Sequence, residues 1–338
     1  MSTTVYESIL SDEKDTEVNL LELADEIIDG RRLNRNDNLD FFIDCNLDEL
    51  RLGADRIREH FIGDTVDLCS IINARSGKCP EDCKYCAQSA HNHTDCEVYD
   101  FLPEEKIVEA CKVNEAAGVD RFAMVTAGRA LDGEEFEKAI QTYKRLSKEC
   151  PDIELCASMG FLSTEQLHRL HLAGVTSYHH NIETSRRNFK NICSTHSFDQ
   201  KIETLKKVKA EGLWACSGGI IGMGEDWQDR LDMALTLSEV AVDSIPINAL
   251  MPIKGTPLEN TKELGEDEII RTISFFRYIN PKADIRLAAG RALLSNDGEY
   301  AFTSGASATI TGNMLTTVAC ATIKSDKEML KRIGRITK

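Results

Sequence analysis

The first part of the chain places apolar residues at helical intervals among polar ones. This spacing is seen in VNLLELADEIIDG (18–30) and again in DELRLGADRIREHF (48–61). Both segments are typical of amphipathic helices, and Gly30 is a residue that commonly follows a helix end. We therefore expect residues 1–60 to form a helical extension ahead of the main domain.

Beyond residue 65, short runs rich in β-branched residues alternate with longer amphipathic segments. The helical segments include 103–118, 163–174 and 198–212, and Ser163 with Gln166 has the S-x-x-Q form of a capping box. The runs typical of strands are 66–72, 120–126, 152–158, 175–181, 213–219, 243–250, 284–289 and 307–310.

This alternation predicts an α/β fold with parallel strands joined by right-handed crossovers. Eight such units in roughly 270 residues favour a (β/α)8 TIM-type barrel. An open doubly wound sheet is the alternative. We expect the barrel to span residues 61–325 and a C-terminal tail to follow at 326–338.

Composition and charge narrow the function classes. The chain has 338 residues, of which 42% are hydrophobic, and its net charge is −16. The acidic balance argues against nucleic acid as a ligand, because phosphate binding needs clustered Lys and Arg. No apolar run reaches the ~18 residues of a membrane span, and the first residues lack the pattern of a signal peptide. We expect a cytoplasmic protein.

The chain contains 12 cysteines, which in a reducing compartment favour metal binding or catalysis over disulfides. Cys79, Cys83 and Cys86 form C-x3-C-x2-C directly after the first strand, where barrel active sites lie. Three thiolates hold three irons of a 4Fe–4S cluster and leave the fourth iron open. Zinc would need a fourth ligand, for which His91 and His93 are the nearby candidates.

This loop resembles the signature of radical S-adenosylmethionine (SAM) enzymes, in which an aromatic residue such as Tyr85 precedes the last cysteine. The resemblance narrows to the biotin synthase family over residues 65–320, on the motifs CPEDCKYCAQS, YHHNIET, CSGGIIGMGE, PINALMPIKGTPL and IRLAAGR. It implies sulfur insertion into dethiobiotin, a reductant such as flavodoxin or ferredoxin, and a homodimer.

The resemblance also implies which residues contact the ligands. Asn248 matches a position that binds the ureido ring of dethiobiotin, although a residue that satisfies a turn is the plain alternative. Asn181 is expected to contact SAM and substrate, and Lys201 stands where family members often carry an arginine for the SAM carboxylate. The full set expected around SAM is Tyr85, Asn181, Glu183, Lys201, Gly218, Gly219 and Ile220.

The well-known biotin synthases hold a second, 2Fe–2S cluster with three cysteines and one arginine. The resemblance assigns Cys156, Cys216 and Arg286 to it, but the remaining cysteine position is Ala123 here, and alanine cannot bind iron. Cys69 is a candidate replacement. Cys69, Cys156, Cys216 and Arg286 fall on predicted strands 1, 3, 5 and 7, and alternate strands supply the side chains of one interior barrel layer.

Three thiolates in such a layer favour an auxiliary cluster of the 4Fe–4S type with an extra sulfide, with a 2Fe–2S cluster as the alternative. The chain thereby also resembles variant biotin synthases of strict anaerobes. Arg286 is then a ligand or a charge partner, and Arg121 offsets negative charge from nearby.

Two other functions stay open at this point: a different radical SAM enzyme, and a non-catalytic metal-binding protein. Cys193 and Cys320 are weaker candidates for a functional role, and His196 could assist at the SAM carboxylate. Core or surface positions are expected for Cys45, Cys96, Cys111 and Cys150.

Overall fold

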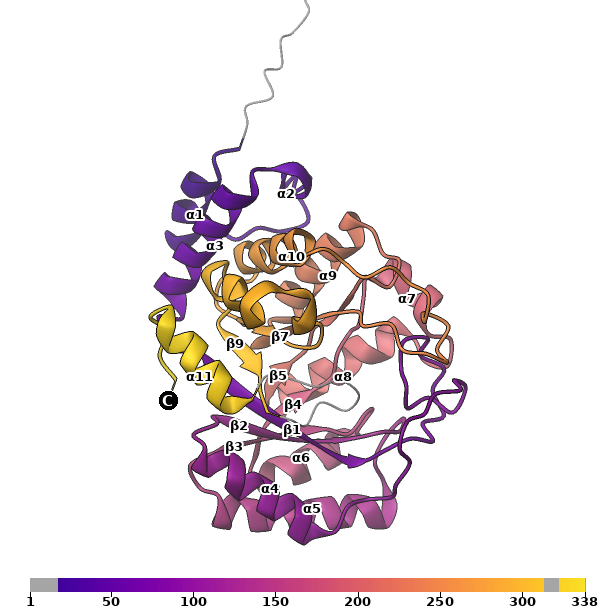
Figure 1. Ribbon diagram of the computed structural model, residues 1–338. Helices are drawn as coiled ribbons and strands as arrows, with labels where there is room; N and C mark the ends of the chain where they lie inside the picture. Colours follow the sequence, from indigo (N-terminus) through magenta and orange to yellow (C-terminus); the bar gives the residue numbers. More distant parts are fainter. Residues whose placement is uncertain (1–17, 313–321, 338) are drawn as a thin grey trace, which may run out of the picture.

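The computed structural model describes residues 18–312 and 322–337, and these form a closed parallel barrel surrounded by helices (Figure 1). The sheet order is β5-β4-β3-β2-β1-β9-β8-β7-β6, and β5 also pairs with β7, which closes the barrel. The strands are β1 (Asp67–Arg75), β2 (Arg121–Thr126), β3 (Glu154–Ser158), β4 (Val175–His179), β5 (Trp214–Cys216), β6 (Gly219–Ile221), β7 (Ser244–Ala249), β8 (Asp284–Leu287) and β9 (Ala308–Ile310).

The short strands β5 and β6 together occupy the fifth position of an eight-strand barrel. β5 pairs with β4 and β7, whereas β6 pairs with β7 and is bridged to Glu183 on its other side. The interruption lies at Ser217 and Gly218. All eight predicted strand positions, and the (β/α)8 barrel rather than an open sheet, are therefore confirmed.

Helices cover the outside of the barrel in alternation with the strands. In α6 the predicted capping box is present, since the Ser163 side chain accepts from Gln166 N and the Gln166 side chain accepts from Ser163 N. The helices are α4 (Glu104–Ala116), α5 (Gly133–Glu149), α6 (Thr164–Leu172), α7 (Arg186–Ile192), α8 (Phe198–Ala210), α9 (Trp227–Val240), α10 (Glu266–Ile279) and α11 (Ile323–Arg332), with 3-10 turns η1 (Arg291–Leu293) and η2 (Ser295–Thr303).

The N-terminal extension contains α1 (Leu20–Ile28), α2 (Phe41–Asp44) and α3 (Leu47–Phe61), and it packs against α10 (Figure 1). Tyr278 of α10 donates a hydrogen bond to Leu20 O at 3.0 Å. Gly53 permits this close approach, because a Cβ there would lie 1.8 Å from the Tyr278 hydroxyl oxygen. The extension is thus anchored to the side of the barrel by a helix of the barrel itself.

The predicted boundary between barrel and tail, at 325/326, falls inside α11. Asp326 is buried and its carboxylate pairs with Arg291 at 2.7 Å. Further along, Ile336 forms a parallel bridge with Thr65, just before β1. The C-terminal residues described here therefore pack onto the barrel.

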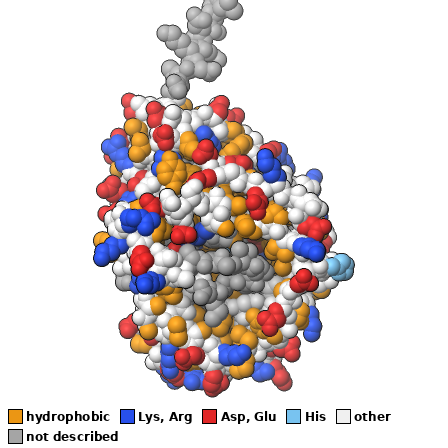
Figure 2. All heavy atoms as spheres, viewed as in Figure 1, with side chains coloured by type: hydrophobic (Ala, Val, Ile, Leu, Met, Phe, Trp, Pro, Cys, Tyr) orange, Lys and Arg blue, Asp and Glu red, His pale blue; other side chains and the backbone are white. Residues whose placement is uncertain are grey.

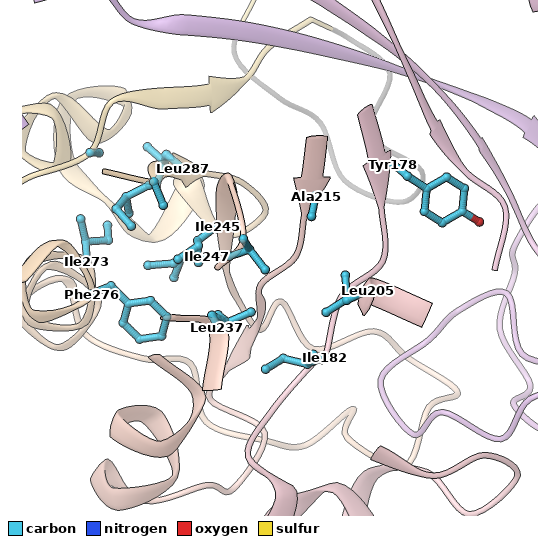
Figure 3. Packing of buried hydrophobic residues seen from close by; sticks show 14 of the residues in the cluster. Tyr178, Ile182, Leu205, Ala215, Leu237, Ile245, Ile247, Ile273, Phe276 and Leu287 are labelled. Atoms are coloured by element: carbon cyan, nitrogen blue, oxygen red, sulfur yellow. The ribbon is translucent and has the colours of Figure 1, made fainter. Parts of the chain in front are cut away.

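The apolar core lies between the barrel and its helices, as Figure 3 shows for Ile245 and Ile247 of β7 beside Phe276 of α10. Because side chains alternate along a strand, the intervening residues of β7 point the other way. Pro246 and Asn248 accordingly line a cavity in the barrel lumen. The lumen lining combines polar and sulfur-containing side chains with apolar ones such as Ile71 and Trp214.

On the face shown in Figure 2, acidic and basic side chains are interspersed. Among the helices described, none has the length and apolar character needed to cross a membrane.

Candidate functional site

The barrel lumen contains a cavity of about 390 Å³. Most of the side chains predicted to form the site line this single space. They come both from the loop that follows β1 and from the strands themselves. The predicted site residues that line it are Cys69, Cys79, Cys86, Arg121, Cys156, Asn181, Glu183, Cys216, Asn248 and Arg286.

The cysteine loop (residues 79–86) has a defined shape without helix or strand. Backbone hydrogen bonds close it, from Cys79 N to Gln88 O at 3.0 Å and from Cys86 N to Cys83 O at 3.1 Å. The Asn92 side-chain amide donates to Cys83 O and Cys86 O at 3.2 and 2.8 Å. These contacts fix the course of the loop backbone and do not use the sulfur atoms.

The three thiols of this loop do not all face the cavity. Cys79 and Cys86 are among the described residues that line it, whereas Cys83 is not. The Cys83 sulfur instead lies 3.8 Å from the sulfur of Cys193. Burial raises the pKa of the Cys86 thiol to about 11, so binding iron there would release a proton.

Glu183 and Lys201 form a charged pair beside the cysteine loop. The Lys201 ammonium lies 3.9 Å from Glu183 Oε1, and Glu183 Oε2 is buried without a hydrogen-bond partner among the described residues. Glu183 also has a φ of 73°, which is uncommon for a residue other than glycine and tends to occur at functional sites. One carboxylate oxygen is therefore free to accept a hydrogen bond.

Two predicted ligand contacts, Asn181 and Asn248, hold the backbone where the fifth strand is interrupted. Asn181 Oδ1 accepts from Gly218 N at 2.9 Å, and Asn248 Nδ2 donates to Gly219 O at 3.0 Å. Asn248 Oδ1 also accepts from Ala289 N at 3.1 Å. Each amide still retains hydrogen-bonding capacity, since an amide has two N–H groups and two oxygen lone pairs.

The glycines Gly218 and Gly219 are required by their neighbours in the barrel. A Cβ on Gly218 would lie 1.9 Å from Pro246 O, and one on Gly219 would lie 2.4 Å from Glu183 O. Close approach of the neighbouring backbone segments at Pro246 and Glu183 therefore accounts for both glycines, rather than the close approach of a ligand that the sequence pattern suggests.

Ile220 and Tyr85 belong to a small apolar cluster next to the cysteine loop. The other members are Ile192, Met223, Leu250 and Leu258. Burial raises the pKa of the Tyr85 phenol well above its usual value, and the nearby Glu183 carboxylate adds to the effect. The cluster offers an apolar surface beside the thiols.

Deeper in the lumen, three cysteines converge from three strands. Cys69 and Cys156 pack together with Ala123, which lies on β2 between their strands. Cys216 contacts His179, with 3.3 Å between the sulfur and Nδ1. Burial raises the pKa of Cys216 to about 11 and lowers that of His179 to about 4, the latter helped by Lys201 and Arg286.

A buried carboxylate, Asp67, joins two arginines at this level. Asp67 Oδ1 pairs with Arg286 at 2.6 Å and Asp67 Oδ2 with Arg121 at 2.8 Å. Although burial favours a raised pKa for Asp67, the two guanidinium groups hold it below its usual value. Arg286 donates further to Thr309 O at 3.2 Å and Ser244 Oγ at 3.3 Å.

The sequence interpretation missed Asp67, although a signal for it exists. Asp67 precedes Cys69 by two residues in β1, so the period of a strand places both side chains on the same face. The sequence also gives no sign that Cys193 and His196 lie beside Cys83. Among the described residues, these three form the group whose ligand atoms are close enough to share one metal ion. Cys320 lies outside the described residues.

Comparison with known proteins places these observations in a family. The Radical SAM superfamily profile matches residues 74–237, and the profile of the Biotin and Thiamin Synthesis associated domain matches residues 246–336. The crystal structure of methylornithine synthase (PylB) is similar with a TM-score of 0.79 over 94% of this chain and 97% of that one. The crystal structure of the [FeFe]-hydrogenase maturase HydG is also similar, with a TM-score of 0.77 over 95% of this chain and 76% of that one.

At 20% and 14% identity, these two structures support the fold alone. Closer relatives are found among curated sequences. The biotin synthase of Clostridium beijerinckii (strain ATCC 51743 / NCIMB 8052) is 59% identical over 312 residues, covering 92% of this chain and 98% of the relative. That of Alkaliphilus metalliredigens (strain QYMF) is 55% identical over 317 residues, covering 94% and 99%. The chain belongs to the biotin synthase family of radical SAM enzymes.

Proposed function

We propose that this chain inserts sulfur into dethiobiotin and so closes the thiophane ring of biotin. The observation that carries this proposal is the single lumen cavity lined by two separate groups of thiols. Cys79 and Cys86 reach it from the loop, and Cys69, Cys156 and Cys216 reach it from the strands. Sulfur insertion needs both a radical generator and a sulfur source within reach of one substrate.

The residues present fit a 4Fe–4S cluster with SAM at the mouth of the cavity. Cys79, Cys83 and Cys86 are soft thiolate ligands suited to iron–sulfur clusters. The unpartnered, buried Glu183 Oε2 suits a ligand that donates hydroxyl groups, as the ribose of SAM does. When bound, cluster and SAM supply the one-electron chemistry that breaks unactivated C–H bonds, which no side chain can supply.

The chain's own residues would bind and orient SAM and substrate. Lys201 would pair with the SAM carboxylate, and the apolar cluster with Tyr85 and Ile220 would pack against adenine. Asn181 and Asn248 would use their remaining amide hydrogen bonds for SAM and for the ureido ring of dethiobiotin. Gly218, Gly219 and the asparagines would also keep the interrupted fifth strand in a fixed shape.

The deeper thiols fit an auxiliary iron–sulfur cluster. Cys69, Cys156 and Cys216 would be its ligands, because Cys69 lies next to Cys156 across the Ala123 position. Three thiols among basic residues favour the four-iron type with an extra sulfide over a 2Fe–2S cluster. Arg286 would be a charge partner, because Asp67 stabilises its protonated form and a protonated guanidinium has no lone pair for iron.

The cell would supply the other partners. A low-potential protein such as flavodoxin or ferredoxin would reduce the mouth cluster, and we propose a cytoplasmic homodimer. Gel filtration with light scattering on the anaerobic holoenzyme would test the dimer: a monomer mass at working concentration would contradict it.

Anaerobic reconstitution tests the function. The protein loaded with iron and sulfide, with SAM, a reductant and dethiobiotin, should form biotin; SAM cleavage without biotin would exclude this substrate. Iron content with Mössbauer spectra distinguishes about eight irons per chain for two four-iron clusters from about six for the 2Fe–2S alternative. Cys69→Ala should lower auxiliary iron and biotin yield; unchanged values would remove Cys69 from the site.

A further inference from the structure

The segment joining α7 to α8 (residues 193–197) is tightly bound to the cysteine loop. Asp82 of the loop accepts from Ser194 N at 2.8 Å and from Thr195 N at 3.1 Å. The backbone adds a hydrogen bond from Lys84 N to Ile192 O at 3.0 Å. Two parts of the chain more than a hundred residues apart are therefore held in a fixed relation.

This docking brings three metal-binding side chains together. The sulfurs of Cys83 and Cys193 lie 3.8 Å apart, and the Cys193 sulfur lies 3.3 Å from His196 Nδ1. All three ligand atoms lie within 4.8 Å of one another. Cys193 and His196 are buried, with 5% and 7% of their surface exposed.

These separations match those between ligands of one tetrahedral ion. With Zn–S near 2.3 Å and Zn–N near 2.0–2.1 Å, tetrahedral angles place two sulfurs about 3.8 Å apart and a sulfur and a nitrogen about 3.5 Å apart. The observed 3.8 and 3.3 Å are close to both values. The trio is thus arranged for a single ion between its members.

Glu81 lies beside this trio and is hydrogen-bonded to its imidazole. Its Oε2 contacts the same His196 Nδ1 directly and accepts from Thr195 Oγ1 at 2.6 Å. Its Oε1 pairs with Arg129 at 2.9 Å, so this carboxylate is already engaged by its neighbours and is not one of the ligand atoms that lie within 4.8 Å of one another. The trio itself supplies two thiolates and one imidazole, and a water molecule would complete a four-coordinate zinc site once the imidazole gives up its contact with Glu81.

We propose that Cys83, Cys193 and His196 bind one divalent metal ion of the zinc type in the chain before its mouth cluster is assembled. Because Cys83 serves both sites, the ion and the 4Fe–4S cluster exclude each other. The site thereby makes cluster assembly sensitive to zinc. This metal site is separate from sulfur insertion, and no biotin assay is needed to test it.

Cobalt titration of the full-length chain, freed of iron and sulfide under anaerobic conditions, tests the site. One equivalent of Co²⁺ should give an intense thiolate-to-cobalt absorption and the visible bands of tetrahedral coordination, and Zn²⁺ should displace both. Cys193→Ala should weaken cobalt affinity by at least about tenfold. Cys79→Ala is the matched control, since it removes one loop thiol outside the set and should leave the cobalt spectrum unchanged.

Circular dichroism establishes that both variants are folded, and Cys193→Ser, which keeps the side-chain size, should behave like Cys193→Ala. Equal loss of affinity in Cys79→Ala and Cys193→Ala would overturn the proposal, because the ion would then belong to the cysteine loop alone. Wild-type affinity in Cys193→Ala or an octahedral cobalt spectrum would overturn it as well. Zinc should also slow cluster reconstitution in the wild type and not in Cys193→Ala; equal slowing in both would contradict the shared ligand.

Discussion

The mouth and the floor of the barrel cavity assemble their thiols in different ways. At the mouth, Cys79, Cys83 and Cys86 come from one short loop, whose shape is held by backbone hydrogen bonds and by Asn92. At the floor, Cys69 and Cys156 come from strands β1 and β3, whose register with β2 brings them together. The mouth therefore depends on local structure, and the floor depends on the whole barrel.

The electrostatics of the two regions differ as well. The floor combines two buried arginines with the buried carboxylate Asp67 and the half-exposed Glu154, so its guanidinium groups belong to one buried charge network. The mouth pairs Lys201 with Glu183 and so offers both signs. Buried guanidinium groups suit a sulfide-rich anion that stays in place, whereas a pair of opposite charges suits the ammonium and carboxylate of a ligand such as SAM that exchanges in each turnover.

The largest effect is expected at the mouth. Cys79→Ala removes one of the three proposed ligands of the cluster that would start the radical chemistry, so both SAM cleavage and biotin formation should fall below detection. Methionine release from SAM and biotin formation, measured on the same anaerobically reconstituted sample, check this. Cys96→Ala is the control, because Cys96 is half-buried near the loop with Ser76 Oγ at 3.6 Å and should leave both products unchanged. If Cys79→Ala released methionine at the wild-type rate, the mouth thiols would not be the site of radical generation, and the contrast between mouth and floor would be wrong.

A loss confined to one product is expected at the floor. Cys156→Ala should abolish biotin formation and lower iron content while SAM cleavage continues, because the mouth cluster keeps its three thiols. Cys111→Ala is the matched control, since Cys111 is fully buried outside the lumen on α4. If Cys156→Ala lost SAM cleavage to the same degree as biotin, the two regions would not be separable.

The same contrast explains what the sequence could predict. The mouth was recognisable from the spacing of three cysteines, and α6 from Ser163 and Gln166, because both signals lie within a few residues. Cys69 required a further step, the assumption of alternate strands facing one lumen, and the structure brings it beside Cys156. Each of these predictions used a regular spacing, either of residues along the chain or of strands around the barrel.

Features that depend on side-chain contacts between distant segments could not be predicted. Cys83 and Cys193 are 110 residues apart, and only the packing of the α7–α8 connection brings them together. The interruption between β5 and β6 depends on the approach of Pro246 O and Glu183 O to two glycines, which no local pattern reveals. Register and tertiary packing decide these features, and neither is encoded in residue spacing alone.

A smaller effect, on stability, is expected from the carboxylate of the floor. Asp67→Asn keeps the side-chain size but leaves Arg286 and Arg121 without their shared counter-charge, which should cost on the order of 3 kcal/mol of folding free energy. Thermal unfolding of the cluster-free chain should show a Tm lowered by roughly 4 °C.

Glu154→Gln separates this effect from the general loss of an ion pair. Glu154 also pairs with Arg121, but its side chain is 48% exposed, so the expected cost is below about 1 kcal/mol. Equal Tm shifts in Asp67→Asn and Glu154→Gln would mean that the buried ion pairs of Asp67 add no more stability than an exposed ion pair does.

The smallest effect is expected from the charge pair of the mouth. Lys201→Gln removes the ammonium beside Glu183 and should raise the KM for SAM about tenfold, or ~1.4 kcal/mol, with little change in kcat, because the lost contact is made equally in ground and transition states. Lys201→Arg keeps the charge and should stay near the wild-type KM, while Lys206→Gln, on the exposed face of α8, controls for surface charge. A fall in cluster iron in Lys201→Gln, rather than a change in KM, would place Lys201 in cluster retention; the mouth would then resemble the floor, and the distinction between an exchanging and a resident ligand would fail.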